Sequence, residues 1–220
     1  MTNPFQKILV DLAAGIPPRY LAAVAHHESS FDPKATNGGA TGLFQITPVV
    51  LKDYNAQHGT SYKRTDLLDP VLNTRVAVDH IHHILDLYST IPALHPDWSQ
   101  RRWVELLTLG WNAGHNGVAR VVQEMRRAGV SPERTTVDTV HAAALAMQYP
   151  GHLADAKHVR FAKVVTATFL GDKEPTPGVA GGGGGSGAVT AVALLAPLGA
   201  LAIGNSVLEA GHDTTRARKS

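Results

Sequence analysis

Apolar side chains recur at spacings of three and four residues along most of the first 170 positions, a period that is typical of helices with one buried face. Strand-like alternation of apolar and polar residues is rare. The pattern therefore predicts a mainly helical body. Besides a helix near the N-terminus, it places helices around residues 71–88, 99–111, 115–128, 135–147 and 156–169.

The N-terminal helix is predicted to begin at Pro17-Pro18, because proline fits the first turn of a helix. It ends before Asp32-Pro33, since the residue before a proline is pushed out of the helical region. A glycine-rich loop, residues 37–42, follows, and Pro48 closes the next short apolar run. Glu28 is predicted to lie at the end of a buried face. The members of that stripe are Leu21, Val24, Ala25 and Glu28, at i, i+3, i+4 and i+7.

The composition changes abruptly after a globular body that we assign to residues 1–174. Residues 175–187 are rich in proline and glycine, which predicts a flexible linker. Residues 188–208 carry no charge, and as a helix they would span roughly 30 Å, which matches a bilayer core. We therefore expect a C-terminal transmembrane helix there, with a buried helix of the globular body as the alternative. A short polar and basic tail, residues 209–220, completes the chain.

Composition and charge narrow the function. The 220 residues, 44% of them hydrophobic, suffice for one domain with a proper core plus an appendage. Twenty Lys and Arg against eighteen Asp and Glu give a net charge of only +2, so we expect no nucleic-acid partner. The absence of cysteine excludes disulfides, cysteine nucleophiles and thiolate metal sites. The first twenty residues do not read as a signal peptide, because they lack its apolar core and cleavage site.

The dipeptide His27-Glu28 could begin a zinc-protease helix, which needs a second histidine four residues after the first. Phe31 occupies that position, so this interpretation fails. Three further histidines fall in one segment, at His80, His82 and His83. The segment has its own apolar helical stripe and no carboxylate at ligand spacing, so we interpret these histidines as structural or surface residues. No metal and no cofactor is expected.

Glu28 is then a carboxylic acid at the end of an apolar stripe. Partial burial disfavours the charged form, so we expect its pKa to be raised and a proton to be available near neutral pH. A general acid that cleaves a glycosidic bond has this requirement. A helix-end glutamate that faces solvent or caps the loop fits the same spacing, and the residues alone leave both interpretations open.

Two segments resemble the first motif of soluble lytic transglycosylase (SLT) domains, which are lysozyme-like enzymes of peptidoglycan. They are residues 28–35, ESSFDPKA, and residues 39–46, GATGLFQI. The resemblance continues with Leu68-Asp69-Pro70 and Asn73. Residues 110–114, GWNAG, are similar to the family's Ala-Tyr-Asn-Ala-Gly turn. The motifs follow one another in the family's order along most of the globular body.

The chain departs from the family pattern at three points. The loop between Ala35 and Gly39 is one residue shorter than usual, and Gly110-Trp111 replaces the commoner Ala-Tyr pair. Residues 157–161, KHVRF, stand in the place of a late Glu-Thr-x-x-Tyr segment but lack its polar side chains. The tyrosine that approaches the catalytic acid in the family thus has no direct counterpart. Tyr149 is a candidate substitute, with a core tyrosine as the alternative interpretation.

The resemblance implies a mainly helical, lysozyme-like fold with Glu28 as the sole catalytic acid and base. It implies cleavage of the β-1,4 bond between N-acetylmuramic acid and N-acetylglucosamine, with a 1,6-anhydro product. The substrate's own acetamido group would then stabilise the positive charge at the anomeric carbon. In glycosidases with two carboxylates, the second carboxylate has this role. The implied substrate-binding residues are Ser29 near the acetamido group, Gln45 and Asn112 lining the cleft, Phe44 and Trp111 as apolar walls, and Tyr149.

Two alternatives stay open. Folding could bring a second acid close to Glu28, from among Asp53, Asp66 and Asp69, and the enzyme would then be a hydrolytic muramidase. Alternatively, the lysozyme-like body could be a non-catalytic glycan-binding protein of a membrane or a virion.

The order of the segments resembles virion-associated transglycosylases of phages with an internal membrane, such as tectiviruses. In that layout an enzymatic domain precedes a glycine tether and a membrane segment. It predicts a location in the internal membrane of a virion and action on the periplasmic cell wall during DNA entry. The expected partners are peptidoglycan glycan strands, the membrane through the C-terminal helix, and virion proteins.

Overall fold

Helices make up most of residues 3–172, the part of the chain that this computed structural model describes. The prediction of a mainly helical body is confirmed. The α-helices are α1 (Gln6–Asp11), α2 (Pro18–Ser29), α3 (Pro48–His58), α4 (Pro70–Ser89), α5 (Arg101–Ala113), α6 (His115–Arg127), α7 (Val137–Ala146) and α8 (Ala156–Leu170). The 3-10 helices are η1 (Arg64–Leu68), η2 (Pro92–Leu94), η3 (Pro132–Arg134) and η4 (His152–Ala154). One antiparallel pair of two-residue strands, β1 (Thr36–Asn37) and β2 (Ala40–Thr41), is the sheet within these residues.

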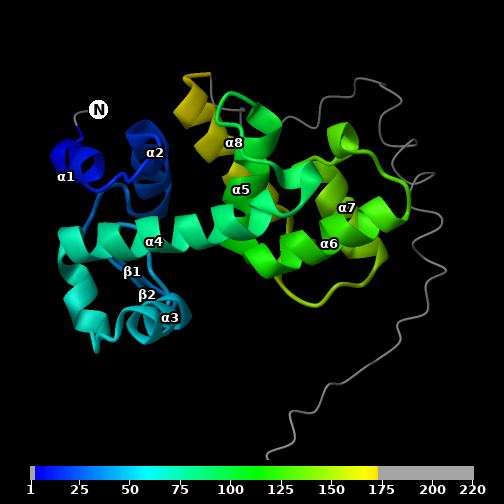
Figure 1. The fold of residues 1–220 in the computed structure, drawn as a ribbon. Coiled ribbons are helices and arrows are strands. Elements are labelled where there is room, and N and C mark those ends of the chain that lie inside the picture. Colours follow the sequence, from blue (N-terminus) through cyan, green and yellow to red (C-terminus); the bar gives the residue numbers. More distant parts are fainter. Residues whose placement is uncertain (1–2, 173–220) are drawn as a thin grey trace, which may run out of the picture.

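The long helix α4 organises the molecule. In Figure 1 it runs across the structure, with α1 and α2 on one side of it and α3 with the β1–β2 pair on the other. Helices α5 to α8 gather at its C-terminal end. Asp69 caps α4 by accepting a hydrogen bond from the Val71 backbone N–H at 2.9 Å, and Pro70 occupies its first turn.

The apolar pattern does not predict two of the helices, α1 and α3. Pro48 was expected only to close an apolar run, but it occupies the first turn of α3. Thr47 caps this helix, because its side chain accepts a hydrogen bond from the Val50 backbone N–H. Only Leu51 and Tyr54 of α3 are buried, so the helix carries almost no periodic signal.

Helix α5 lies at the centre of the second half of the body, and all its residues from Trp103 to Gly110 are buried. It packs against α6 and α8, and α8 also packs against α2. The Tyr20 hydroxyl of α2 hydrogen-bonds the Thr108 hydroxyl of α5 at 3.1 Å. These contacts fix α2 to the core, and they thereby fix the position of Glu28 in its last turn.

Within residues 3–172, no helix is both long and apolar enough to cross a membrane. The predicted linker, the predicted transmembrane helix at residues 188–208 and the predicted basic tail lie outside the described residues. They stay predictions.

Candidate active site

A cleft of about 800 Å³ is formed by α2, α3, α4 and the turn between α5 and α6. This volume lies within the range of small-molecule binding sites. Glu28 enters it from the end of α2, and Trp111 and Asn112 from the end of α5. Gln45 lines it from the loop that precedes α3. Four of the residues that the sequence nominates therefore meet in one cleft.

The Glu28 carboxyl group is hydrogen-bonded within the cleft and largely desolvated. Its Oε1 accepts a hydrogen bond from Trp111 Nε1 at 2.8 Å. Burial raises the pKa of Glu28 to about 7, while the hydrogen bond from Trp111 opposes this rise. The expectation of a raised pKa is confirmed. At and below neutral pH this side chain holds a proton that it can donate.

The backbone turns sharply just after Glu28. Ser30 and Phe31 adopt left-handed conformations, with φ of 54° and 65°, which are uncommon for residues other than glycine. Asp32 accepts a hydrogen bond from the Lys34 backbone N–H at 2.8 Å within the following turn. The Ser29 hydroxyl donates to the backbone carbonyls of Ala25 (3.1 Å) and Leu43 (2.8 Å). Ser29 is not among the residues that line the cleft; it ties the end of α2 to the loop that carries Gln45, and its predicted contact with substrate stays a prediction.

Asn73, a fully buried residue of α4, holds that loop. Its Oδ1 accepts a hydrogen bond from the Phe44 backbone N–H at 2.8 Å. Its Nδ2 donates to the backbone carbonyls of Thr41 (2.9 Å) and Leu67 (3.0 Å). Gly42 has a φ of 81°, and a Cβ atom there would lie 2.2 Å from Asn73 Nδ2. The loop can therefore dock on Asn73 only with glycine at this position.

Gln45 is held in place by its own amide group. Its Nε2 donates to the backbone carbonyls of Ala35 (3.0 Å) and Gly42 (2.9 Å). The residue has a φ of 47°, a left-handed conformation that the loop imposes. With the amide nitrogen engaged, the carbonyl oxygen of Gln45 is the atom that remains for a substrate donor.

The Trp111 indole lies between two rings. Phe44 contacts it edge-on, with ring centroids 6.4 Å apart, and His80 contacts it with centroids 5.6 Å apart. Phe44 is fully buried. The predicted role of Phe44 as a wall against sugar is therefore corrected: the loop held by Asn73 turns this ring into the core, where it supports Trp111 from behind. Trp111 itself lines the cleft.

Asn112 is oriented by α8. Its Oδ1 accepts a hydrogen bond from His158 Nδ1, and His158 is buried. The Asn112 amide nitrogen remains available to the cleft. Residues 157–161 were expected to lack the polar side chains of the family's late segment, but His158 supplies a polar contact to the site from this position.

Tyr149 does not line the cleft with Glu28. It lines a neighbouring hollow of about 220 Å³, where Arg120 lies 5.9 Å from the centre of its ring. The aromatic side chain that approaches Glu28 is Trp111, through its hydrogen bond to the carboxyl group. The proposed role of Tyr149 beside the catalytic acid is therefore corrected.

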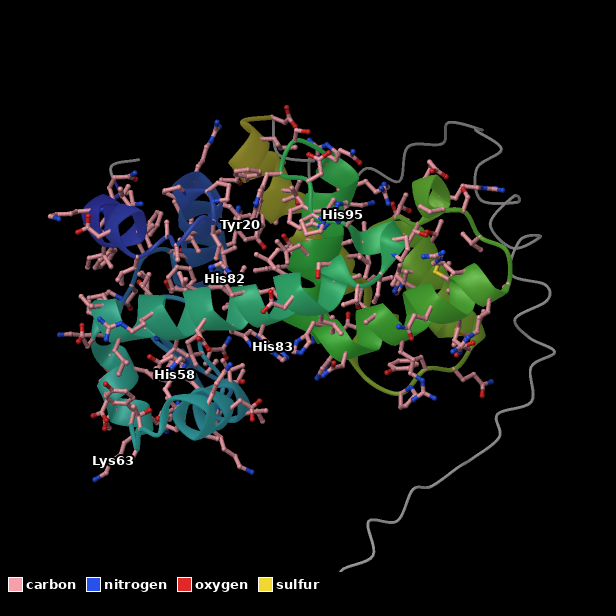
Figure 2. The ribbon with its side chains drawn as sticks, viewed as in Figure 1. Tyr20, His58, Lys63, His82, His83 and His95 are labelled. Carbon is pink, nitrogen blue, oxygen red and sulfur yellow. The ribbon has the colours of Figure 1, made fainter. Side chains whose placement is uncertain are left out.

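Four histidines line the cleft that the sequence analysis did not assign to it. They are His80 and His83 of α4, His115 at the start of α6 and His152 of η4. Figure 2 shows His82 and His83 on opposite sides of α4. The interpretation of His80 and His83 as merely structural or surface residues is therefore incomplete. His80 and His83 are one helical turn apart, but no local pattern connects them to His115.

The candidates for a second carboxylate fall into two groups: those that line the cleft and those that have a structural role. Asp53 of α3 lines the cleft, together with Asp79 of α4. Asp66 accepts a hydrogen bond from the Lys63 backbone N–H at 2.8 Å, and Asp69 caps α4. Asp66 and Asp69 are thus structural. Within residues 3–172 no group of three or more His, Asp or Glu side chains is arranged to hold a metal ion.

Comparisons with known proteins identify a family and a similar fold. The model of the family described as "Transglycosylase SLT domain" matches residues 10–131. The fold is similar to that of the 70 kDa soluble lytic transglycosylase SLT70 from Escherichia coli, with a TM-score of 0.50 and 20% sequence identity. The similarity covers 78% of this chain and 26% of that structure, so the chain spans about a quarter of that protein's length. No curated protein sequence matches. Because the family model covers more than half of the chain, the chain belongs to the transglycosylase SLT domain family.

Proposed function

We propose that this protein is a peptidoglycan lytic transglycosylase in which Glu28 is the catalytic acid and base. One observation carries the proposal: Glu28 presents a carboxyl group with a pKa of about 7 to an 800 Å³ cleft, and Trp111 orients it. A protonated carboxylic acid at neutral pH can protonate the oxygen of a glycosidic bond. The membership of the SLT family supports peptidoglycan as the substrate.

In the proposed reaction, Glu28 donates its proton to the oxygen of the β-1,4 bond between N-acetylmuramic acid and N-acetylglucosamine. The bond from the anomeric carbon to that oxygen breaks, and the acetamido group of the muramic acid stabilises the positive charge. The Glu28 carboxylate then takes the proton of the C6 hydroxyl group, whose oxygen closes the 1,6-anhydro ring. Glu28 ends protonated, and no water is consumed.

A hydrolytic muramidase is the second candidate, because Asp53 and Asp79 line the same cleft as Glu28. Asp79 accepts a hydrogen bond from His58 Nε2 at 2.8 Å, which engages it with α3. Asp53 is therefore the stronger candidate for a carboxylate that activates water.

Digestion of purified sacculi and mass measurement of the released muropeptides test the proposal. The expected products end in anhydro-muramic acid, and Glu28→Gln abolishes them. Reducing ends that disappear in Asp53→Asn would instead show the muramidase. If the folded wild-type protein releases no product, both enzymatic proposals fail and only the glycan-binding alternative stands.

We also propose that the enzyme belongs to a virion with an internal membrane and opens the cell wall locally during DNA entry. The order of segments supports this proposal: a glycine-rich stretch and then an uncharged stretch of 21 residues follow the catalytic body. Purified particles should contain the protein, and detergent rather than salt should release it. Its absence from purified particles would sink this proposal and leave the enzymatic one intact.

A further inference from the structure

The Trp111 indole is supported on two sides by rings of different character. Phe44 is fully buried behind it and belongs to the core. His80 supports it from the side of the cleft, with ring centroids 5.6 Å apart and an angle of 60° between the ring planes. The indole Nε1 lies 2.8 Å from Glu28 Oε1. The position of the hydrogen bond to Glu28 therefore depends on the ring of His80.

His80 is itself part of a cluster of rings. Its centroid lies 5.2 Å from that of His115 and 6.5 Å from that of His83. The centroids of His83 and His115 are 5.1 Å apart. No side-chain hydrogen bond joins these three imidazoles to other described residues, so ring packing alone places them. Figure 2 shows His83 on the side of α4 away from His82.

We propose, building on the transglycosylase function above, that His80 is a positioning residue whose uncharged ring holds the Trp111 indole on the Glu28 carboxyl group. His80 acts through Trp111 and does not touch the reacting atoms. The ring must be uncharged, because a charged imidazolium is stabilised by water and would leave its half-buried contact with the indole.

Burial and the charges around the cluster keep His80 neutral. Burial, together with the neighbouring His115 and His83, lowers the pKa of His80 to about 4, while Asp79 of α4 acts in the opposite direction. Burial and His83 also lower the pKa of His115, against the effect of Asp53 of α3. Glu28 of α2, Tyr54 of α3 and His152 of η4 are the remaining titratable groups that line the cleft.

A window of activity follows from these values. Glu28 holds its proton below a pKa of about 7, and His80 loses its charge above a pKa of about 4. The active form therefore exists between the two, so activity should rise as the pH passes about 4 and fall as it passes about 7. The acid limb belongs to the histidine and the basic limb to the glutamate.

Two substitutions of His80 separate the role of the ring from that of the nitrogen atoms. His80→Phe keeps a flat ring without a titrating group, and His80→Ala removes the ring. Exposed His95 provides the matched control, His95→Ala. Circular dichroism verifies that each variant is folded. The first readout is the ¹⁵N–¹H resonance of the Trp111 indole in the full chain, assigned with Trp111→Phe and followed from pH 4 to 9 without substrate.

In the wild type and in His95→Ala, this resonance should titrate with Glu28 near pH 7. In His80→Phe it should keep that titration, whereas in His80→Ala it should shift and lose it. The second readout is kcat and KM on soluble glycan oligomers. We expect kcat to fall by about tenfold to a hundredfold in His80→Ala with KM changed by less than about twofold, because the acid is misplaced. His80→Phe should retain kcat within about threefold at pH 6, with its acid limb moved to lower pH.

Two results would overturn the proposal. One is a His80→Ala variant with the wild-type indole resonance. The other is a His80→Phe variant that loses as much kcat as His80→Ala, because the nitrogen atoms rather than the ring would then matter. If the resonances behave as expected but wild-type protein releases nothing from sacculi, the positioning of Glu28 stands and the proposed reaction fails.

Discussion

The two walls of the cleft are held in place by different interactions. On one side, the end of α2 and the loop of residues 40–46 are held by hydrogen bonds between backbone groups and the side chains of Ser29, Gln45 and Asn73. On the other side, the wall of α4 and the α5–α6 turn is built of ring contacts, with Trp111 and His80 at its centre. The hydrogen bond from Trp111 to Glu28 joins the two walls at the catalytic acid.

Because of this difference, substitutions in the first wall should affect the stability of the protein, and substitutions in the second wall should affect its activity. A buried hydrogen bond is directional, and loss of one partner leaves the other unsatisfied, so changes in the first wall should unfold the protein. The rings of the second wall are partly open to the cleft and pack on one another without hydrogen bonds between them. Changes there should cost little stability and should alter the ionisation and position of Glu28 instead.

Gly42→Ala should break the first wall most severely. A Cβ atom at Gly42 would lie 2.2 Å from Asn73 Nδ2 and 2.4 Å from the Leu67 carbonyl oxygen, at a φ of 81°. We expect a loss of about 4 kcal/mol or more in the free energy of unfolding, measured by urea denaturation. Gly59→Ala is the matched control, because Gly59 has a φ of 63° but no described atom within 4 Å of an added Cβ. It should cost only about 1 kcal/mol, and equal losses in the two variants would contradict the role given to Asn73.

Asn73→Ala should cost about 3 to 4 kcal/mol, because it leaves the Phe44 N–H and the Leu67 carbonyl without their partner and removes one of the two hydrogen bonds of the Thr41 carbonyl. The comparison is with His83→Ala in the ring wall, where we expect a change within about 0.5 kcal/mol because His83 is exposed. Urea denaturation of both variants measures the contrast. Similar losses at the two positions would show that the walls do not differ in this way.

The first wall could largely be predicted from the sequence, because its residues lie close together along the chain. The stripe that ends at Glu28 and the glycine-rich loop mark it locally, and the raised pKa of Glu28 follows from burial. The side on which each loop residue points could not be predicted. Phe44 and Gln45 are neighbours, and only docking on Asn73 sends the first into the core and the second to the cleft.

The second wall could not be predicted, because it forms from segments that are distant in sequence. His80 and His115 meet only when α4 crosses the start of α6. His158 reaches Asn112 from α8 although the local motif of that segment differs from the family's. The same limit applies to the fold: long helices with a buried stripe were predicted, whereas α3, which buries only two side chains, was not.

Glu28→Gln should show how much stability the protein loses by burying an ionised carboxylate between the two walls. The pKa of Glu28 is raised from 4.5 to about 7 on folding, so its contribution to stability is complete below pH 4.5 and is lost as the pH rises through 7. The variant should therefore match the wild type at pH 4 and exceed it by about 3 kcal/mol at pH 9. Urea denaturation at the two pH values measures this.

Glu133→Gln is the control for this pH dependence, since a backbone hydrogen bond lowers the pKa of the exposed Glu133. That variant should gain no stability at high pH. An equal effect of Glu28→Gln at pH 4 and pH 9 would mean that Glu28 is not desolvated by the fold.

Trp111→Phe should sharpen the comparison, because it removes the hydrogen bond that joins the two walls. The indole N–H favours the ionised form of Glu28, so its loss should raise the pKa of Glu28 and move the basic limb of kcat/KM to higher pH. At pH 6 we expect kcat to fall about tenfold, because the carboxyl group loses its fixed orientation. Trp111→Tyr restores a ring with a hydroxyl donor and should recover part of the loss. A basic limb that stays in place in Trp111→Phe would show that burial by the first wall alone sets the ionisation of Glu28, and the ring wall would then act only through the position of the acid.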